Sequence, residues 1–295
     1  MKNLSLRIKS ANSKNGFSLI ELSIVLVIVG IFIFGASQLY VITAEKAKVD
    51  STVTTLDAID RALRLYYKTH KDLPCPADGN LAINDNNFGL GNETNDGTAS
   101  QACTYDRFYG NAGVASNSVN AYGGVVPTRT LNLPDTYMFD GWGNRITYVV
   151  DDNCVNTLAS AVASCKLLTA SGPDLKVYDN SNNATGTDAD DLRTGVATYV
   201  IISHGKNGVG AWRRDGGANR IPSVAGTTVP EMENAHVNTT GGLATGGNAP
   251  NENFRDDFIR DWKGTETGSG IAGQDGTYFD DMVHWKTQAQ LAYED

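Results

Sequence analysis

A run of 26 residues near the N-terminus constrains this chain more than any other feature. It extends from Phe17 to Ile42, reads FSLIELSIVLVIVGIFIFGASQLYVI and contains a single charged residue, Glu21. As an α-helix, it would be about 39 Å long at about 1.5 Å per residue. The hydrocarbon core of a bilayer is about 30 Å thick. The sequence therefore predicts a membrane-spanning helix over residues 17–42.

The sixteen residues before this run are polar and basic. They contain four basic side chains and no acidic one. An ordinary secretory signal places its cleavage site after the hydrophobic run, next to small residues, whereas here the small residue Gly16 comes before it. Positive charges that precede a span hold that end of it in the cytoplasm. We therefore expect the residues beyond the span to lie outside the cytoplasm.

Glu21 is the anomaly within this helix. A carboxylate inside an apolar anchor costs about 2–4 kcal/mol, depending on its depth. Either it lies near the interface and reaches water, or it has a partner of opposite charge. The residues alone leave both explanations open.

The segment Gly16-Phe17-Ser18-Leu19-Ile20-Glu21 resembles the prepilin cleavage and methylation motif of type IV pilins and type II secretion pseudopilins. The resemblance implies that a prepilin peptidase cuts after Gly16 and N-methylates Phe17, while the hydrophobic helix stays on the mature protein. It also implies that Glu21 pairs with the positive Phe17 amine of a neighbouring subunit. An ammonium and a carboxylate attract strongly in a low-dielectric bundle, and each offsets the burial of the other.

Beyond the run the pattern becomes amphipathic. Apolar residues recur every three or four positions, which is typical of a helix with one buried face; they are Val49, Val53, Leu56, Ile59, Leu63 and Tyr66. A proline at position 74 prevents continuation, so we expect one helix from Phe17 to about His70. The stripe lasts only about three heptads, which is short for a coiled-coil stalk. We divide the chain into a leader (1–16), a transmembrane and assembly helix (17–42), its amphipathic continuation (43–72) and a globular head (73–295).

The head contains several segments with β-type composition. The strongest is Val196–Ile202, another is Arg145–Val150, and weaker candidates are Gly124–Pro127, Lys166–Thr169 and Phe279–Trp285. A short amphipathic helix is predicted at Asn253–Trp262. The predicted fold is α+β, with the long N-terminal helix packed on an antiparallel β-sheet that carries long loop insertions.

The head also resembles pseudopilins, through the segment Asp140-Gly141-Trp142-Gly143-Asn144-Arg145-Ile146-Thr147-Tyr148. It is similar to the DPWGNPY segment of the major type II secretion pseudopilin, with Gly141 and Arg145-Ile146 in place of the prolines. A wider set of blocks is similar to larger bacterial prepilin-type proteins; these blocks are 73–78, 126–131, 203–208 and 279–283. Polar insertions lie between them at 78–101, 179–194 and 223–252, and we interpret them as solvated surface in preference to partner-binding loops.

The four cysteines show no CxxC pair, which argues against a zinc site. In an exported protein an even number favours two disulfides, with three possible connectivities. We favour the two pairings that are local in sequence, Cys75 with Cys103 and Cys154 with Cys165.

Other chemistry has little support in the sequence. The net charge is -9, and it becomes -13 without the leader residues Lys2, Arg7, Lys9 and Lys14; such an acidic head disfavours nucleic-acid binding. The four histidines lack catalytic or metal-binding spacing, and no cofactor is expected. The major pseudopilin family binds calcium in a C-terminal loop, and this resemblance makes Asp280 and Asp281 weak calcium candidates, although we favour solvated turns as the explanation of such residues.

These features predict a structural, non-enzymatic subunit, of minor type because of its length, in a type IV pilus or type II secretion pseudopilus. By resemblance its partners are other pilin or pseudopilin subunits, the prepilin peptidase and the inner-membrane assembly platform. The predicted location is the bacterial inner membrane, with a single span and the head in the periplasm or on an extracellular filament. The alternatives are a filament-displayed adhesin and a membrane-tethered periplasmic enzyme.

Overall fold

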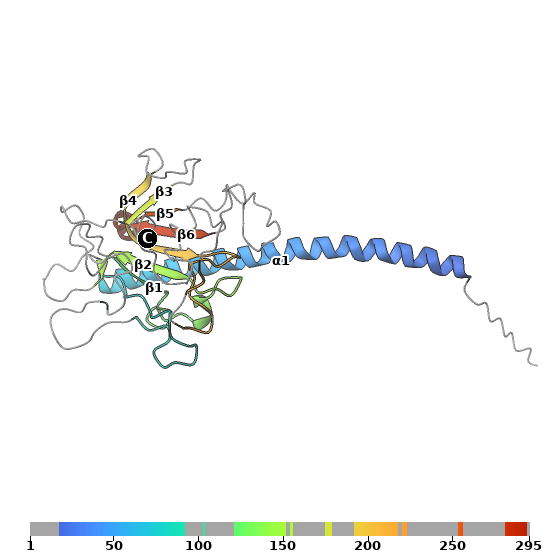
Figure 1. The fold of residues 1–295 in the computed structure, drawn as a ribbon. Helices are drawn as coiled ribbons and strands as arrows, with labels where there is room; N and C mark the ends of the chain where they lie inside the picture. Colours follow the sequence, from blue (N-terminus) through green and yellow to red (C-terminus); the bar gives the residue numbers. More distant parts are fainter. Residues whose placement is uncertain are drawn as a thin grey trace, which may run out of the picture. The chain divides into compact units, whose positions relative to one another are not determined.

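The computed structural model describes residues 18–91, 103, 121–151, 154–155, 175–178, 192–217, 220–222, 253–255 and 281–293. These residues form a long helix, a six-stranded sheet, a short 3-10 helix (η1, Asp135–Met138) and a short C-terminal helix (α4, Gln288–Tyr293) (Figure 1). The α+β prediction is therefore confirmed. The chain divides into two compact units, residues 1–47 and 48–295.

Helix α1 extends from Leu19 to His70 and contains 52 residues. Its C-terminal boundary agrees with the sequence prediction, and the start predicted at Phe17 lies outside the described residues. The helix ends because Lys71 adopts a left-handed conformation, with φ of 64°, and its N–H donates to the carbonyl oxygen of Tyr67 at 2.8 Å. A left-handed residue of this kind is a common helix terminator, and Pro74 follows shortly after.

The sheet has the strand order β1-β2-β4-β3-β5, and β6 also pairs with β4. The strands are β1 (Ala121–Val125), β2 (Thr147–Asp151), β3 (Leu175–Tyr178), β4 (Leu192–Ser203), β5 (Asn253–Arg255) and β6 (Met282–Thr287). All pairings are antiparallel except that of β3 with β5, which is parallel. The long strand β4 is central because β2, β3 and β6 all pair with it.

Most described strands overlap the predicted ones, with differences at their ends. The strongest prediction, Val196–Ile202, lies inside β4, and the predicted segments at 145–150, 124–127 and 279–285 overlap β2, β1 and β6. Strand β4 begins at Leu192, so the insertion expected at 179–194 ends earlier than predicted. The candidate strand Lys166–Thr169 lies outside the described residues.

The helix predicted at Asn253–Trp262 is wrong at its start. Residues Asn253–Arg255 form β5 and pair with Lys176–Tyr178 of β3. Backbone pairing with an available strand edge here outweighs the weak helical pattern, because local propensity yields to tertiary context. The remainder of that prediction, 256–262, lies outside the described residues.

Two apolar clusters flank the sheet. The first joins the buried face of α1 to alternate strand residues, and includes Leu56, Ile59, Leu63, Tyr148, Val150, Tyr199 and Ile201. The second lies on the other face of the strands and joins Val149, Val200 and Ile202 to the loop residues Phe88, Met138 and Trp212. Successive strand side chains point to opposite faces, so β2 and residues 197–203 of β4 are buried on both sides. Figure 1 shows the C-terminal part of α1 beside the strands of the second unit.

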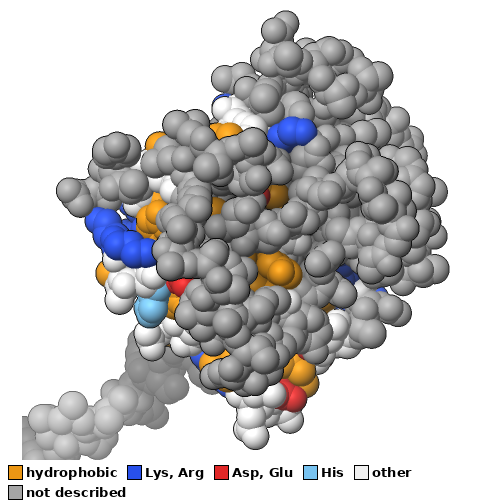
Figure 2. Space-filling model, turned by 90° about the vertical axis from the view of Figure 1, so that its left-hand side faces the viewer, with side chains coloured by type: hydrophobic (Ala, Val, Ile, Leu, Met, Phe, Trp, Pro, Cys, Tyr) orange, Lys and Arg blue, Asp and Glu red, His pale blue; other side chains and the backbone are white. Residues whose placement is uncertain are grey.

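The second cluster corrects our interpretation of the first insertion. Residues 78–91 are not simply solvated surface, because Phe88 is fully buried against the sheet and the Arg145 guanidinium donates to the carbonyl oxygens of Gly79 and Leu81. Figure 2 shows one face on which the described hydrophobic side chains reach the surface as small, separate patches. The sheet is thus covered by α1 on one side and by this ordered loop layer on the other.

Candidate assembly site

The N-terminus of α1 is held by the acid singled out in the sequence. The Ser18 carbonyl oxygen accepts from the Leu22 N–H at 3.1 Å, and the Ser18 N–H donates to Glu21 Oε2 at 3.0 Å. A glutamate at the third helical position that reaches back to the N-cap N–H is half of a capping box. Sequence reasoning missed this role, although the Ser-x-x-Glu spacing is its usual signature. Gly16 and Phe17 lie outside the described residues, so their cleavage and methylation stay predictions.

The first unit exposes large apolar side chains around the whole helix. Between Leu19 and Phe34 their exposed fractions range from 45% at Val29 to 88% at Leu19. A helix that is apolar on every side is normally covered by protein or by lipid, whereas the carboxylate of Glu21 marks one polar point at its start. Among the residues that the structure describes, no helix is both long and apolar enough to cross a membrane. The membrane span therefore stays a prediction.

A protein family model matches the N-terminal segment that includes the first part of α1. Residues 11–37 match the family described as the prokaryotic N-terminal methylation motif. The chain carries the type IV pilin and pseudopilin signature. Neither the curated proteins nor the solved structures gave a match. The pilin motif implies association with other pilin subunits and with a prepilin peptidase, and it points to a structural protein and not to a known enzyme family.

The outer part of α1 is tied to the head by buried polar contacts as well as by the apolar core. The Tyr199 hydroxyl of β4 donates to Asp60, whose other oxygen lies 3.1 Å from Arg64 Nε. The Gly141 N–H donates to Thr52 Oγ1 at 2.9 Å. Because burial without a partner is expensive for such groups, these contacts fix one rotation of residues 48–70 against the sheet.

The DGWGN segment that resembles the pseudopilin motif makes a tight turn around one carboxylate. Asp140 accepts hydrogen bonds from the backbone N–H groups of Trp142 and Asn144 and from Ser203 Oγ at 2.8 Å. Burial raises the pKa of Asp140 to about 6, and the same hydrogen bonds act in the opposite direction. The turn therefore joins the helix side of the head to the end of β4.

The next residues of this block hold the loops together. The Arg145 side chain is fully buried, donates to the carbonyl oxygens of Gly79, Leu81 and Arg214 and stacks over Phe88 at 5.1 Å. Burial lowers the pKa of Arg145, whereas Asp78 and Asp215 raise it. Sequence analysis placed this residue in a strand and did not detect its role, because a loop contact of this range leaves no local signal.

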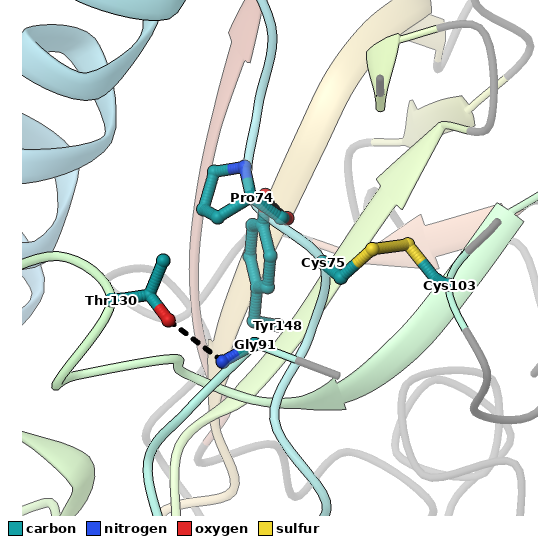
Figure 3. Close-up of a disulfide and its surroundings, with 6 residues drawn as sticks. All are labelled: Pro74, Cys75, Gly91, Cys103, Thr130 and Tyr148. Atoms are coloured by element: carbon teal, nitrogen blue, oxygen red, sulfur yellow. Dashed lines mark hydrogen bonds between the residues drawn. A yellow bond between two sulfur atoms is a disulfide. The ribbon is translucent and has the colours of Figure 1, made fainter. Parts of the chain in front are cut away.

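The disulfide prediction is resolved for one pair. Cys75 and Cys103 are bonded, with 5.5 Å between their Cα atoms, next to the Tyr148 hydroxyl, which donates to the Pro74 carbonyl oxygen (Figure 3). Nearby, the Gly91 N–H donates to Thr130 Oγ1. Cys154 is also disulfide-bonded, and Cys165 lies outside the described residues. The block at 73–78 thus contacts β2 beside this bond, and the block at 126–131 contacts Gly91.

The described histidines are His70, His204 and His284; His284 Nδ1 on β6 lies 3.9 Å from Asp57 Oδ1, and burial lowers its pKa. His204 is fully buried, its Nε2 lies 2.8 Å from Thr147 Oγ1, and burial lowers its pKa to about 3. Thr147 is equally inaccessible, so a substrate could not reach this pair. His70 stacks on Tyr66 at the exposed end of α1, and His236 lies outside the described residues.

The structure describes only one of the two calcium candidates. Asp281 is buried, and Asp280 lies outside the described residues. Within the described ranges, no group of three or more histidine, cysteine or acidic residues could hold a metal ion. A calcium site stays a prediction that rests on resemblance alone.

Proposed function

We propose that this chain is a subunit, of minor type, of a type IV pilus or type II secretion pseudopilus. One observation carries the proposal: the methylation motif at residues 11–37 coincides with the first part of α1, which from Leu19 to Phe34 is apolar on every side and carries one carboxylate, Glu21, near its start. In this proposal a prepilin peptidase cuts after Gly16 and methylates Phe17. The apolar helix then anchors the protein in the inner membrane and later packs against other subunits.

Glu21 has two roles in this proposal. Within its own chain it accepts the Ser18 N–H. In the filament its charge balances the Phe17 ammonium of a neighbouring subunit, because burial of either ion alone is costly and their pairing offsets that cost. The two roles can be separated, since a glutamine accepts the same backbone hydrogen bond but has no charge.

The test compares Glu21→Gln with Ser23→Ala in cells that express the full chain and its assembly machinery. We expect Glu21→Gln to be found in the membrane fraction and to be processed, but to be absent from sheared filaments. Ser23 is a matched control because it only donates to the Ile20 carbonyl oxygen within the same helix. Normal incorporation of Glu21→Gln would show that charge pairing does not drive assembly.

A further inference from the structure

The loop that follows β4 presents two arginines to solvent on a fixed backbone. Arg213 and Arg214 are exposed, and they come directly after Trp212, which is buried. The Gly216 N–H donates to the Arg213 carbonyl oxygen at 3.0 Å, and the buried Arg145 guanidinium donates to the Arg214 carbonyl oxygen at 2.8 Å. The two charges therefore stand on a part of the loop that is held to the head.

The DGWGN turn connects these arginines to the point where α1 enters the second unit, whose first residue is Lys48. A Cβ atom at Gly141 would lie 2.8 Å from the Lys48 Cα. Two residues later, a Cβ atom at Gly143 would lie 3.1 Å from Arg214 Nη1. The half-buried Trp142 comes between these two glycines. We call the accessible side chains of this region the entry surface; they are Trp142, Arg213 and Arg214.

We propose that the entry surface contacts the anionic headgroups of the membrane in which the preceding helix is anchored. This inference rests on the proposed function, because the anchor is part of it. Five residues separate Ile42, the end of the predicted span, from Lys48. Even a fully extended chain covers only about 20 Å over that distance. The connection therefore keeps the entry surface within reach of the headgroups at any angle between the two units.

The chemistry of the entry surface favours a lipid surface as its partner. Tryptophan is enriched at membrane–water interfaces, and arginine is attracted to anionic headgroups. The exposed acid of the same loop, Asp215, interacts with the buried Arg145 guanidinium, as does Asp78. The chain without its leader has a net charge of -13, so an anionic membrane repels the head as a whole. Attraction at one basic surface would therefore also orient the head.

The first experiment measures contact between the head and lipid in the full-length chain, reconstituted into vesicles of phosphatidylcholine with or without phosphatidylglycerol. All four tryptophans come after residue 48, so lipids with a spin label on the headgroup quench fluorescence from the second unit alone. We expect quenching that requires phosphatidylglycerol, that high salt removes because it screens the charges, and that Trp142→Phe largely abolishes.

Two negative results have different meanings. If the chain floats with the vesicles but phosphatidylglycerol adds no quenching, the entry surface does not contact lipid, and the proposed function is left intact. If the chain does not float with vesicles of either composition, the anchor that belongs to the proposed function is wrong.

The second experiment compares Arg213→Glu with Arg61→Glu, which changes the charge equally at an exposed position about 20 Å along α1 from Lys48. Arg213→Glu should lower the ratio of contacting to free heads, calculated from the quenched fraction, at least about fivefold, since one cation near an anionic surface contributes about that factor. Arg213→Lys and Arg61→Glu should each leave the ratio within about twofold of the wild type, because both keep the charge of the entry surface.

Equal losses for Arg213→Glu and Arg61→Glu would show an effect of net charge and overturn the proposal. If Arg213→Glu leaves the quenching unchanged but lowers the yield of filaments in cells, the entry surface binds protein, and the proposed membrane contact is wrong.

Discussion

Replacement of Gly141 by alanine tests whether the DGWGN turn packs directly on the backbone of α1. A Cβ atom at this position would lie 2.8 Å from the Cα and carbonyl carbon of Lys48, and closer still to its carbonyl oxygen. Real Cβ atoms essentially never approach other heavy atoms so closely, and the obstacle is helix backbone, which cannot rotate away as a side chain would. The turn or the helix must therefore move.

Two effects determine how much Gly141→Ala destabilises the protein. Over-packing of a close contact typically costs about 1–3 kcal/mol. Displacement of the turn also weakens the 2.9 Å hydrogen bond from the Gly141 N–H to Thr52 Oγ1, and such a bond contributes about 1 kcal/mol. We therefore expect Gly141→Ala to lower the free energy of unfolding by about 2–4 kcal/mol. A proline, which the resembling pseudopilin segment has at this position, should be worse because it also lacks the N–H.

The assay is urea unfolding of the full-length chain in detergent, followed by tryptophan fluorescence. Thr52→Val is the matched comparison because it removes the acceptor at nearly constant volume, and it should cost about 1–3 kcal/mol. The two changes act on one contact, so the double variant should be less destabilised than the sum of the single variants. A cost below about 0.5 kcal/mol for Gly141→Ala, which is the range of an ordinary surface substitution, would refute the argument.

The other predictions concern the same head. The pKa of Asp140 is raised from 3.8 to about 6, so the native state binds this proton more tightly than the unfolded state. The proton therefore contributes about 3 kcal/mol to the free energy of unfolding below pH 4, and this contribution is lost as the pH rises through 6. Asp140→Asn should reduce the change of the unfolding free energy with pH, measured by urea titrations at several pH values. An unchanged pH dependence would show that other groups cause it. Cys75→Ser should lower the free energy of unfolding by about 2–5 kcal/mol, seen as a lower Tm that added reductant changes less than in the wild type. Asp60→Ala should cost more than Tyr199→Phe, because it leaves the Tyr199 hydroxyl buried without its acceptor, and equal Tm values for the two variants would contradict that account.

Sequence patterns predicted those elements whose determining residues are close together in the chain. The end of α1 follows from its apolar stripe and from Pro74, and the β-branched composition of Val196–Ile202 gave the core of β4. The cysteine spacing favoured the Cys75–Cys103 bond that the structure contains. In each case the determining residues lie close together in the sequence.

Contacts between distant segments were not predictable in this way. Strand β5 pairs with β3 across more than seventy residues, and its helical pattern gave the wrong prediction. The ordered loop at 78–91 was interpreted as solvated surface because its polar composition hides the burial of Phe88. The role of Arg145 likewise depends on three carbonyl oxygens supplied by two separate loops.

The N-terminal mass of the mature protein tests the central claim most directly. Protein isolated from the membrane fraction of cells with the assembly machinery should begin at Phe17 and carry one methyl group on its amine. An unprocessed chain that begins at Met1, or a cut beyond Ile42 that removes the apolar helix, would contradict the proposed function.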